Sequence, residues 1–74
     1  MFAMRYKEIG LKIAYYRKKK GLTQAQLAEK VGISTNYIGL LERGNNGKSF
    51  SMGTLFTIAQ VLEVEPEELL SNNF

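Results

Sequence analysis

The residues that could do specific chemistry stand close together near the middle of the chain. Thr35 and Asn36 carry a hydroxyl and a carboxamide, and Leu40 and Arg43 follow at helical spacing. A carboxamide can pair bidentately with an adenine, a threonine can donate, accept or touch a thymine methyl group, and a leucine offers apolar contact. These side chains suit the reading of a base-pair edge, although Thr35 and Asn36 could instead serve only to cap a helix.

Catalysis and metal binding have little support in the composition. The chain contains no histidine, cysteine or aspartate, which removes the commonest metal ligands and most catalytic bases and nucleophiles. Glutamates at positions 63, 65, 67 and 68 surround Pro66, and the start of a helix there would favour carboxylates. The sequence therefore predicts a protein that is not an enzyme and that uses no metal and no cofactor.

Charge is distributed unevenly along the chain, although the net charge is only +3. Residues 1–20 hold seven cations and one anion, whereas residues 51–74 hold four glutamates and no cation. This asymmetry favours a molecule that turns one side toward a polyanion, but solvated helix faces would produce the same pattern. The run from Lys18 to Lys20 is likewise open to two interpretations, because lysines suit both the end of a helix dipole and the attraction of phosphate.

The segment 23–44 predicts two short helices joined by a tight turn. Thr23, with a glutamine three residues later, has the spacing of a capping box. Gly32 can end the first helix in the left-handed conformation, and Ser34 or Thr35 can cap the second. Two helices of about eight residues around a turn that contains glycine form the helix-turn-helix pattern.

Three further helices are expected around this pair, at residues 5–20, at about 51–62 and from 66 onward, which makes the protein an all-α bundle of five short helices. The loop 45–50 separates the third helix from the fourth, and Phe50 is expected to pack onto the core. The predicted buried stripes are Tyr6, Ile9, Leu11, Ile13 and Tyr16 in the first helix and Met52, Leu55, Ile58, Ala59 and Leu62 in the fourth.

Seventy-four residues make one domain with a small core, and we expect that domain to span residues 1–74. The ends, residues 1–4 and 72–74, are expected to be flexible. No apolar run approaches the roughly 18 residues that span a bilayer, and charges interrupt any apolar leader. We therefore expect a cytoplasmic protein with no membrane contact.

Arg17 differs from the neighbouring lysines because its guanidinium can form a bidentate pair with a carboxylate. It lies one turn before Gly21, on the same side of the first helix as Ile13. Glu42 is the expected partner because it lies among apolar residues near the end of the third helix. The alternative is that both are ordinary surface charges.

Helical geometry divides the second half of the motif into residues that face bases and residues that face phosphates. Ile38 and Leu41 must face the core, which leaves a groove-facing edge made of Thr35, Asn36, Gly39, Leu40 and Arg43, the last of which is also a candidate phosphate contact. The residues expected at phosphates are Gln24, Tyr37, Arg43, Asn45, Asn46 and Lys48. Gln24 could also be an ordinary first-turn residue, and Asn45 and Asn46 could simply form a turn.

A family resemblance rests on several short motifs taken in order. They are Arg17; Gly21-Leu22-Thr23-Gln24; Leu27-Ala28; Val31-Gly32-Ile33-Ser34; Tyr37-Ile38; Leu41-Glu42-Arg43-Gly44; and Thr54-Leu55-Phe56-Thr57-Ile58-Ala59 with Leu62 and Val64. In these residues the chain resembles the Cro/C1-type (lambda-repressor-like, XRE) helix-turn-helix transcription regulators. The resemblance runs from Ile9 to Leu70.

The resemblance implies a bundle of five helices that binds operator DNA as a symmetric dimer. It implies that Gln24 braces the recognition helix at a phosphate, that Arg17 and Glu42 form an internal ion pair, and that Arg43 contacts a phosphate. Gly39 and Leu40 depart from the polar residues that are more usual in relatives.

We therefore expect a bacterial or phage-encoded homodimer that reads a palindromic operator, acting as a repressor or controller. The candidate dimer surface consists of exposed parts of the fourth helix together with Leu69, Leu70 and Phe74, although the two leucines could equally belong to the monomer core. The alternative is an antitoxin-like or adaptor module that binds another protein through its acidic C-terminal face.

Overall fold

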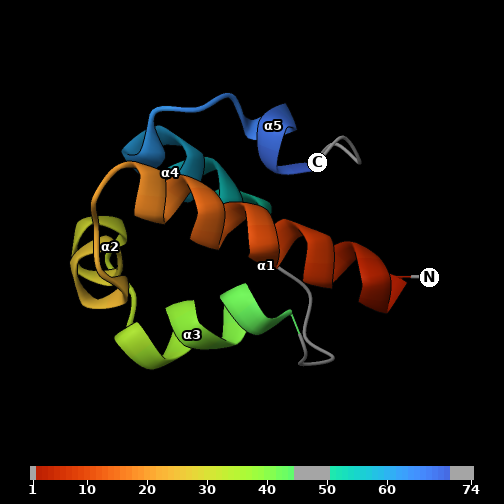
Figure 1. Ribbon diagram of the computed structural model, residues 1–74, viewed down its shortest axis with the longest axis horizontal. Coiled ribbons are helices and arrows are strands. Elements are labelled where there is room, and N and C mark those ends of the chain that lie inside the picture. The colour runs from red at the N-terminus through yellow and green to blue at the C-terminus, as the bar shows by residue number, and fades with distance from the viewer. Residues whose placement is uncertain (1, 45–50, 71–74) are drawn as a thin grey trace.

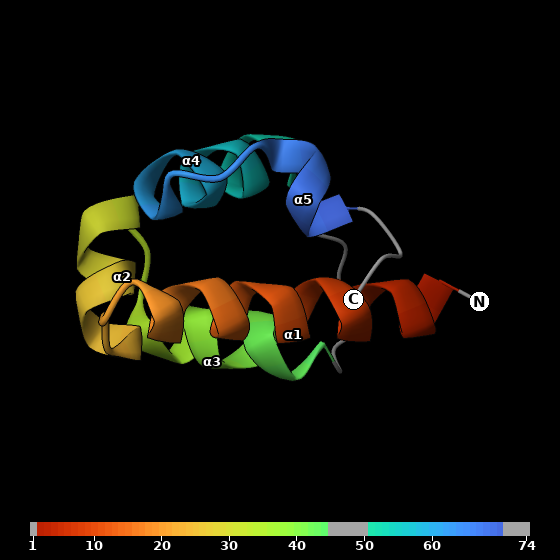
Figure 2. The same ribbon diagram turned by 45° about the horizontal axis from the view of Figure 1, so that its top comes forward.

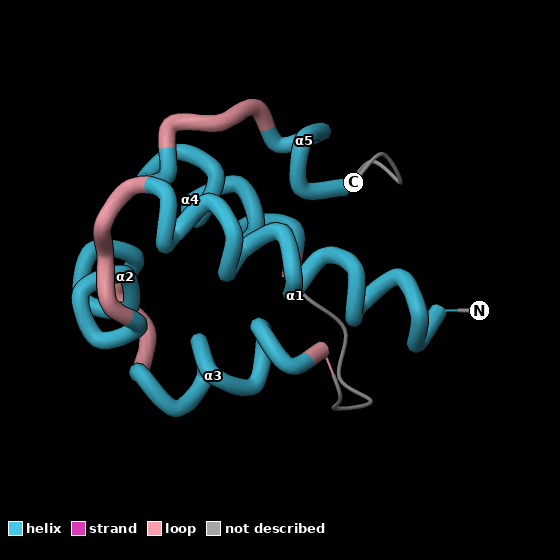
Figure 3. The backbone as a smooth tube through the Cα atoms, viewed as in Figure 1, coloured by secondary structure: helices cyan, strands magenta, loops and turns pink. Residues whose placement is uncertain are grey.

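The computed structural model describes residues 2–44 and 51–70 and places five α-helices in them, with no strand in those ranges. The all-α prediction is confirmed for this part of the chain (Figures 1 and 3). Phe50 lies outside the described residues. The helices are α1 (Phe2–Lys19), α2 (Gln24–Val31), α3 (Thr35–Arg43), α4 (Met52–Leu62) and α5 (Pro66–Leu70).

The helices form two layers that are closed at one end. The long helix α1 lies beside α3 in one layer, and α4 with α5 forms the other (Figure 2). The short helix α2 packs on both α3 and α4 and joins the layers near the end of α1. In Figure 1, α3 lies at the lower edge of the bundle, away from α4 and α5. No helix within residues 2–44 and 51–70 combines the length and the apolar character that a bilayer crossing requires.

Side-chain caps begin the three middle helices, as the sequence predicts. Thr23 and Gln26 form a capping box, in which Gln26 N donates to Thr23 Oγ1 at 3.0 Å and Thr23 N donates to Gln26 Oε1 at 2.8 Å. Ser34 Oγ accepts from Tyr37 N, and Ser51 Oγ accepts from Thr54 N, both at 3.0 Å. These bonds satisfy amides that a helix start would otherwise leave without a partner.

The core is made of aliphatic side chains from all five helices. Its buried members are Ile9, Ile13, Leu27, Ala28, Ile38, Leu41, Leu55, Ile58, Ala59, Leu62 and Leu69.

Two residues of the predicted stripes are exposed in the structure, and one residue outside the stripes is buried. Leu11 is 48% exposed, because it stands two residues from both Ile9 and Ile13 and so faces the opposite side of α1. Lys12 occupies the buried face instead and is only 2% exposed. Met52, at the start of α4, is 50% exposed and faces outward. The prediction that Leu11 and Met52 are buried is therefore wrong.

The helices α1 and α3 touch through their backbones at two glycines. A Cβ atom added to Gly10 would lie 2.6 Å from Glu42 O and would also overlap Leu41 O. A Cβ added to Gly44 would lie 2.6 Å from Tyr6 O, and Gly44 also has a φ of +62° that favours glycine. No side chain separates the two helices at these points, so their spacing depends on the absence of a Cβ.

Replacing the first of these glycines should separate the helices. Gly10→Ala is expected to lower the free energy of unfolding by at least about 1–3 kcal/mol, because the new methyl group must push the backbone of α3 away. Urea denaturation followed by circular dichroism measures the loss. Gly53→Ala is the matched control, since its Cβ would meet only Ser51 Oγ at 3.6 Å and should leave stability equal or higher. An unchanged unfolding midpoint for Gly10→Ala would contradict this description of the contact.

Candidate nucleic-acid interface

The N-terminus of α3 presents two polar side chains to solvent. Ser34 provides the cap, so the hydroxyl of Thr35 is not needed for capping, and both Thr35 and Asn36 are exposed. Ile38 and Leu41 are buried on the opposite side of the helix. This orientation directs a hydroxyl and a carboxamide outward from the start of a helix whose inner side is fixed in the core.

A buried ion pair joins α3 to α1. Arg17 Nε donates to Glu42 Oε2 at 2.6 Å, and Arg17 Nη2 donates to Glu42 Oε1 at 3.1 Å, which makes the pair bidentate. The two side chains are only 9% and 7% exposed. The ion pair predicted between these residues is therefore present, and its burial rules out the alternative of two surface charges.

Two more hydrogen bonds extend this pair to α2 and to the turn before it. Arg17 Nη1 donates to Leu22 O at 2.8 Å, and Gln24 Nε2 donates to Glu42 Oε1 at 2.9 Å. The carboxylate of Glu42 thus receives donors from both α1 and α2, and among the described residues every buried side-chain polar atom has a hydrogen-bond partner. The network of Arg17, Leu22, Gln24 and Glu42 holds α3 at a fixed place on the bundle. The sequence did not reveal the bond from Gln24 to Glu42.

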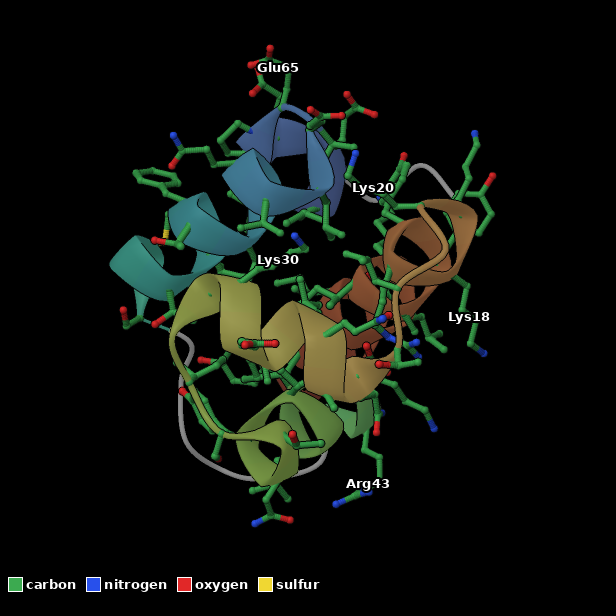
Figure 4. All side chains as sticks on the ribbon, turned by 90° about the vertical axis from the view of Figure 1, so that its left-hand side faces the viewer. Lys18, Lys20, Lys30, Arg43 and Glu65 are labelled. Carbon is green, nitrogen blue, oxygen red and sulfur yellow. The ribbon has the colours of Figure 1, made fainter. Side chains whose placement is uncertain are left out.

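The remaining residues of the predicted interface differ in their exposure. Tyr37 and Leu40 are half-buried, and Gly39 is buried. The atoms nearest to the place where a Cβ of Gly39 would lie are Arg43 Nη1 at 3.7 Å and Gln24 Oε1 at 4.0 Å. Arg43 is exposed and projects from the end of the molecule opposite to Glu65 (Figure 4).

Three residues predicted at phosphates cannot be placed. Asn45, Asn46 and Lys48 lie outside the described residues.

The lysines at the end of α1 are divided between different contacts. Lys20 Nζ lies 2.6 Å from Glu63 Oε1, and Lys19 lies over the ring of Tyr15 at 5.6 Å from its centroid. Lys18 is exposed and projects away from the acidic end (Figure 4). The hydrogen bond and charge of Lys20 hold the pKa of the Glu63 carboxyl below its ordinary value. The run of three lysines is therefore not one uniform phosphate-facing patch.

The acidic helix α5 also contacts α1. Tyr16 Oη donates to Glu68 Oε1 at 3.2 Å, and desolvation together with this hydrogen bond raises the pKa of the Tyr16 hydroxyl. Among the residues that the structure describes, no three acidic side chains gather closely enough to hold a metal ion. The acidic side chains at 63 and 68 are thus bonded to α1 or to the turn that follows it.

The predicted dimer surface needs correction at one residue. Leu69 is 0% exposed and lies in the core of the single chain, so it has no surface to offer a second copy. Leu70 packs partly against the same core, and Phe74 lies outside the described residues. The fourth helix was also expected to contribute exposed residues, and α4 does expose an apolar pair, Met52 and Phe56, which lie four residues apart and are each 50% exposed.

Comparison with known proteins identifies the architecture. A family model described as helix-turn-helix matches residues 13–69. The transcriptional regulator SinR of Bacillus licheniformis is 38% identical over 63 residues, which cover 85% of this chain and 56% of SinR. The chain therefore spans just over half the length of this relative.

Solved structures agree with the sequence matches. The restriction-modification controller protein C.AhdI from Aeromonas hydrophila superposes with a TM-score of 0.79 at 33% identity, covering 86% of this chain and 94% of that protein. SinR crystallised in complex with DNA superposes with a TM-score of 0.78 at 36% identity, covering 85% of this chain and 98% of that one. Both similarities cover most of the two-layered bundle.

Removing the carboxylate of the buried pair should destabilise the fold. Glu42→Ala is expected to lower the free energy of unfolding by about 3–5 kcal/mol, because the charge of Arg17 would remain buried without its partner. Chemical denaturation of the two proteins measures the difference. Glu63→Ala removes an ion pair whose carboxylate is 75% exposed, and it should cost much less. Equal stabilities of Glu42→Ala and the wild type would refute the bracing role of the pair.

Proposed function

Because this chain belongs to the Cro/C1-type helix-turn-helix family, we propose that it is a transcription regulator that binds double-stranded DNA through α3. The observation that carries the proposal is the exposed start of α3, where Thr35 and Asn36 project from a helix fixed by the Arg17–Glu42 pair. A helix held in this way fits the major groove, which admits one α-helix and displays a distinct pattern for each base pair.

In this proposal the start of α3 reads bases. Asn36 pairs bidentately with an adenine, and Thr35 hydrogen-bonds a base or touches a thymine methyl group. Leu40, half-buried one turn further on, adds an apolar contact of the kind that also suits a thymine methyl group. The base-contacting face of α3, formed by Thr35, Asn36 and Leu40, is therefore partly polar and partly apolar.

Contacts to the DNA backbone come from residues around α3. A carboxamide nitrogen has two donors, so Gln24 can bond Glu42 with one and a phosphate with the other. The hydroxyl of half-buried Tyr37 and the basic residues around α3 supply further contacts and positive charge. Asn45, Asn46 and Lys48 would extend this grip along the following loop.

We further propose that the protein acts as a homodimer on a palindromic operator in the cytoplasm of a bacterium or phage host, as a repressor or controller. One domain measures 30 × 23 × 20 Å, whereas successive major grooves on one side of DNA lie about 34 Å apart. Two copies are thus needed to reach two half-sites. Met52 and Phe56 are the best candidates for the dimer surface because they form an exposed apolar pair on α4, away from α3.

The protein-binding alternative has less support. It relied on the acidic residues of the C-terminal part as a free surface for a partner. Glu63 and Glu68 instead contact Lys20 and Tyr16 within the same chain. The DNA proposal needs no such surface.

The dimer proposal predicts a specific loss of association. Phe56→Glu should shift the protein toward the monomer, because two buried carboxylates would have to face each other across the symmetry axis. Sedimentation velocity over a range of protein concentrations measures this shift. Leu11→Glu, which replaces a similarly exposed leucine on α1, should leave association unchanged. If Phe56→Glu and the wild type associate equally strongly, α4 does not form the dimer interface.

DNA binding is tested with a duplex that the wild type selects from a random pool. Its affinity should fall linearly with salt on a log–log plot, because phosphate contacts release counterions. Asn36→Ala should lose about 1–3 kcal/mol of discrimination at one base pair and keep the wild-type salt slope. Filter binding or fluorescence anisotropy with single-base-pair variants of the duplex measures both quantities.

A charge variant provides the contrast for this experiment. Lys18→Ala removes an exposed cation and should weaken binding to all sequences about equally, with a salt slope smaller by about one. Equal losses on every sequence for Asn36→Ala would make Asn36 a backbone contact. Wild-type binding that is absent, or that does not change with salt, would overturn the proposed function.

A further inference from the structure

Gly39 is a glycine in the interior of α3 that the fold does not require. Its φ is not positive, unlike those of Gly21, Gly32 and Gly44. A Cβ added to it would meet nothing closer than 3.7 Å, whereas the same addition at Gly10 would overlap the backbone of α3. Glycine in a helix interior lowers stability relative to alanine. The presence of glycine at position 39 therefore needs a reason other than the packing of the single chain.

Two side chains cover this position. Arg43 Nη1 and Gln24 Oε1 are the atoms closest to the missing Cβ, and Gly39 is buried although it has no side chain of its own. Arg43 stands four residues after Gly39, and side chains on a helix lean toward its N-terminus, so the guanidinium lies back over position 39. Gln24 cannot fill the space further, because its carboxamide is bonded to Glu42.

This arrangement places Arg43 on the base-contacting face of α3. Residues 36, 39 and 43 share one helical face, since they are three and four residues apart. A guanidinium that lies back along this face is directed toward the start of α3, where Asn36 is exposed. A side chain at position 39 larger than a methyl group would occupy the same volume and displace it.

We propose that Gly39 is a specificity-determining residue. Because it has no side chain, the Arg43 guanidinium can lie along α3 and read a guanine in the major groove. The inference rests on the proposed DNA-binding function and, of the two expected roles of Arg43, assigns it the base contact and not the phosphate contact. The planar guanidinium offers two parallel donors that match O6 and N7 of guanine, which is the commonest specific contact in the major groove. The ammonium of a lysine keeps the charge but lacks this geometry.

The test uses the duplex that the wild type selects and its single-base-pair variants. Arg43→Lys should keep the salt slope but reduce the preference for guanine at one position by about 5- to 150-fold. Gly39→Leu should reduce the preference at the same position by a similar factor, because the leucine occupies the place of the guanidinium. The double variant should show little further loss, since both changes remove one contact.

Two controls separate this result from damage to the fold. Thermal melting of Gly39→Leu should give a melting temperature no lower than that of the wild type, and Gly53→Ala removes a glycine from α4 without changing base preference. An unchanged guanine preference in Arg43→Lys, with salt-dependent wild-type binding, overturns the inference and leaves the proposed function intact. Equal weakening on all duplexes also overturns it, because Arg43 would then be a phosphate contact. Absence of wild-type binding overturns both proposals.

Discussion

The position of α3 depends on one carboxylate. Glu42 accepts two hydrogen bonds from Arg17 and one from Gln24, so a single side chain connects the outer edge of the bundle to α1 and α2. Burying a charge is costly unless it is paired and hydrogen-bonded, and here both side chains are more than nine-tenths buried with their partners in place. Such a pair tolerates few other arrangements, because any displacement of α3 by an ångström or more would leave a buried charge without its partner.

The architecture was largely predictable because its signals are local. The capping box of Thr23, the serine caps and the glycine at position 32 act within a few residues, and the structure shows each where the sequence places it. The buried ion pair was also predictable, since Arg17 and Glu42 each follow an apolar face and only an arginine can form the bidentate pairing. Spacing along the chain was enough for these features.

The features that were missed depend on which distant segments meet. Leu11 and Lys12 are neighbours, and their exposure is decided by how α1 is rotated against the other helices. Leu69 could be assigned to the core only once α5 was seen to pack against α1 and α4. The pairing of Lys20 with Glu63 joins residues 43 positions apart, and the bond from Gln24 to Glu42 joins residues 18 apart. No sequence pattern distinguishes Lys20 and Glu63 from other surface charges, and none distinguishes Gln24 from other surface amides.

The backbone contact at Gly10 and Gly44 has a consequence for the thermodynamics of recognition. Two helices that meet without intervening side chains have no flexible layer on which to slide, so α3 and α1 move together as one body. The entropy of ordering α3 is therefore lost when the chain folds and is not lost again when a ligand arrives. Less binding free energy is lost to conformational ordering when a surface is preorganised in this way. The affinity of α3 for a ligand should therefore depend mainly on the contacts between the two.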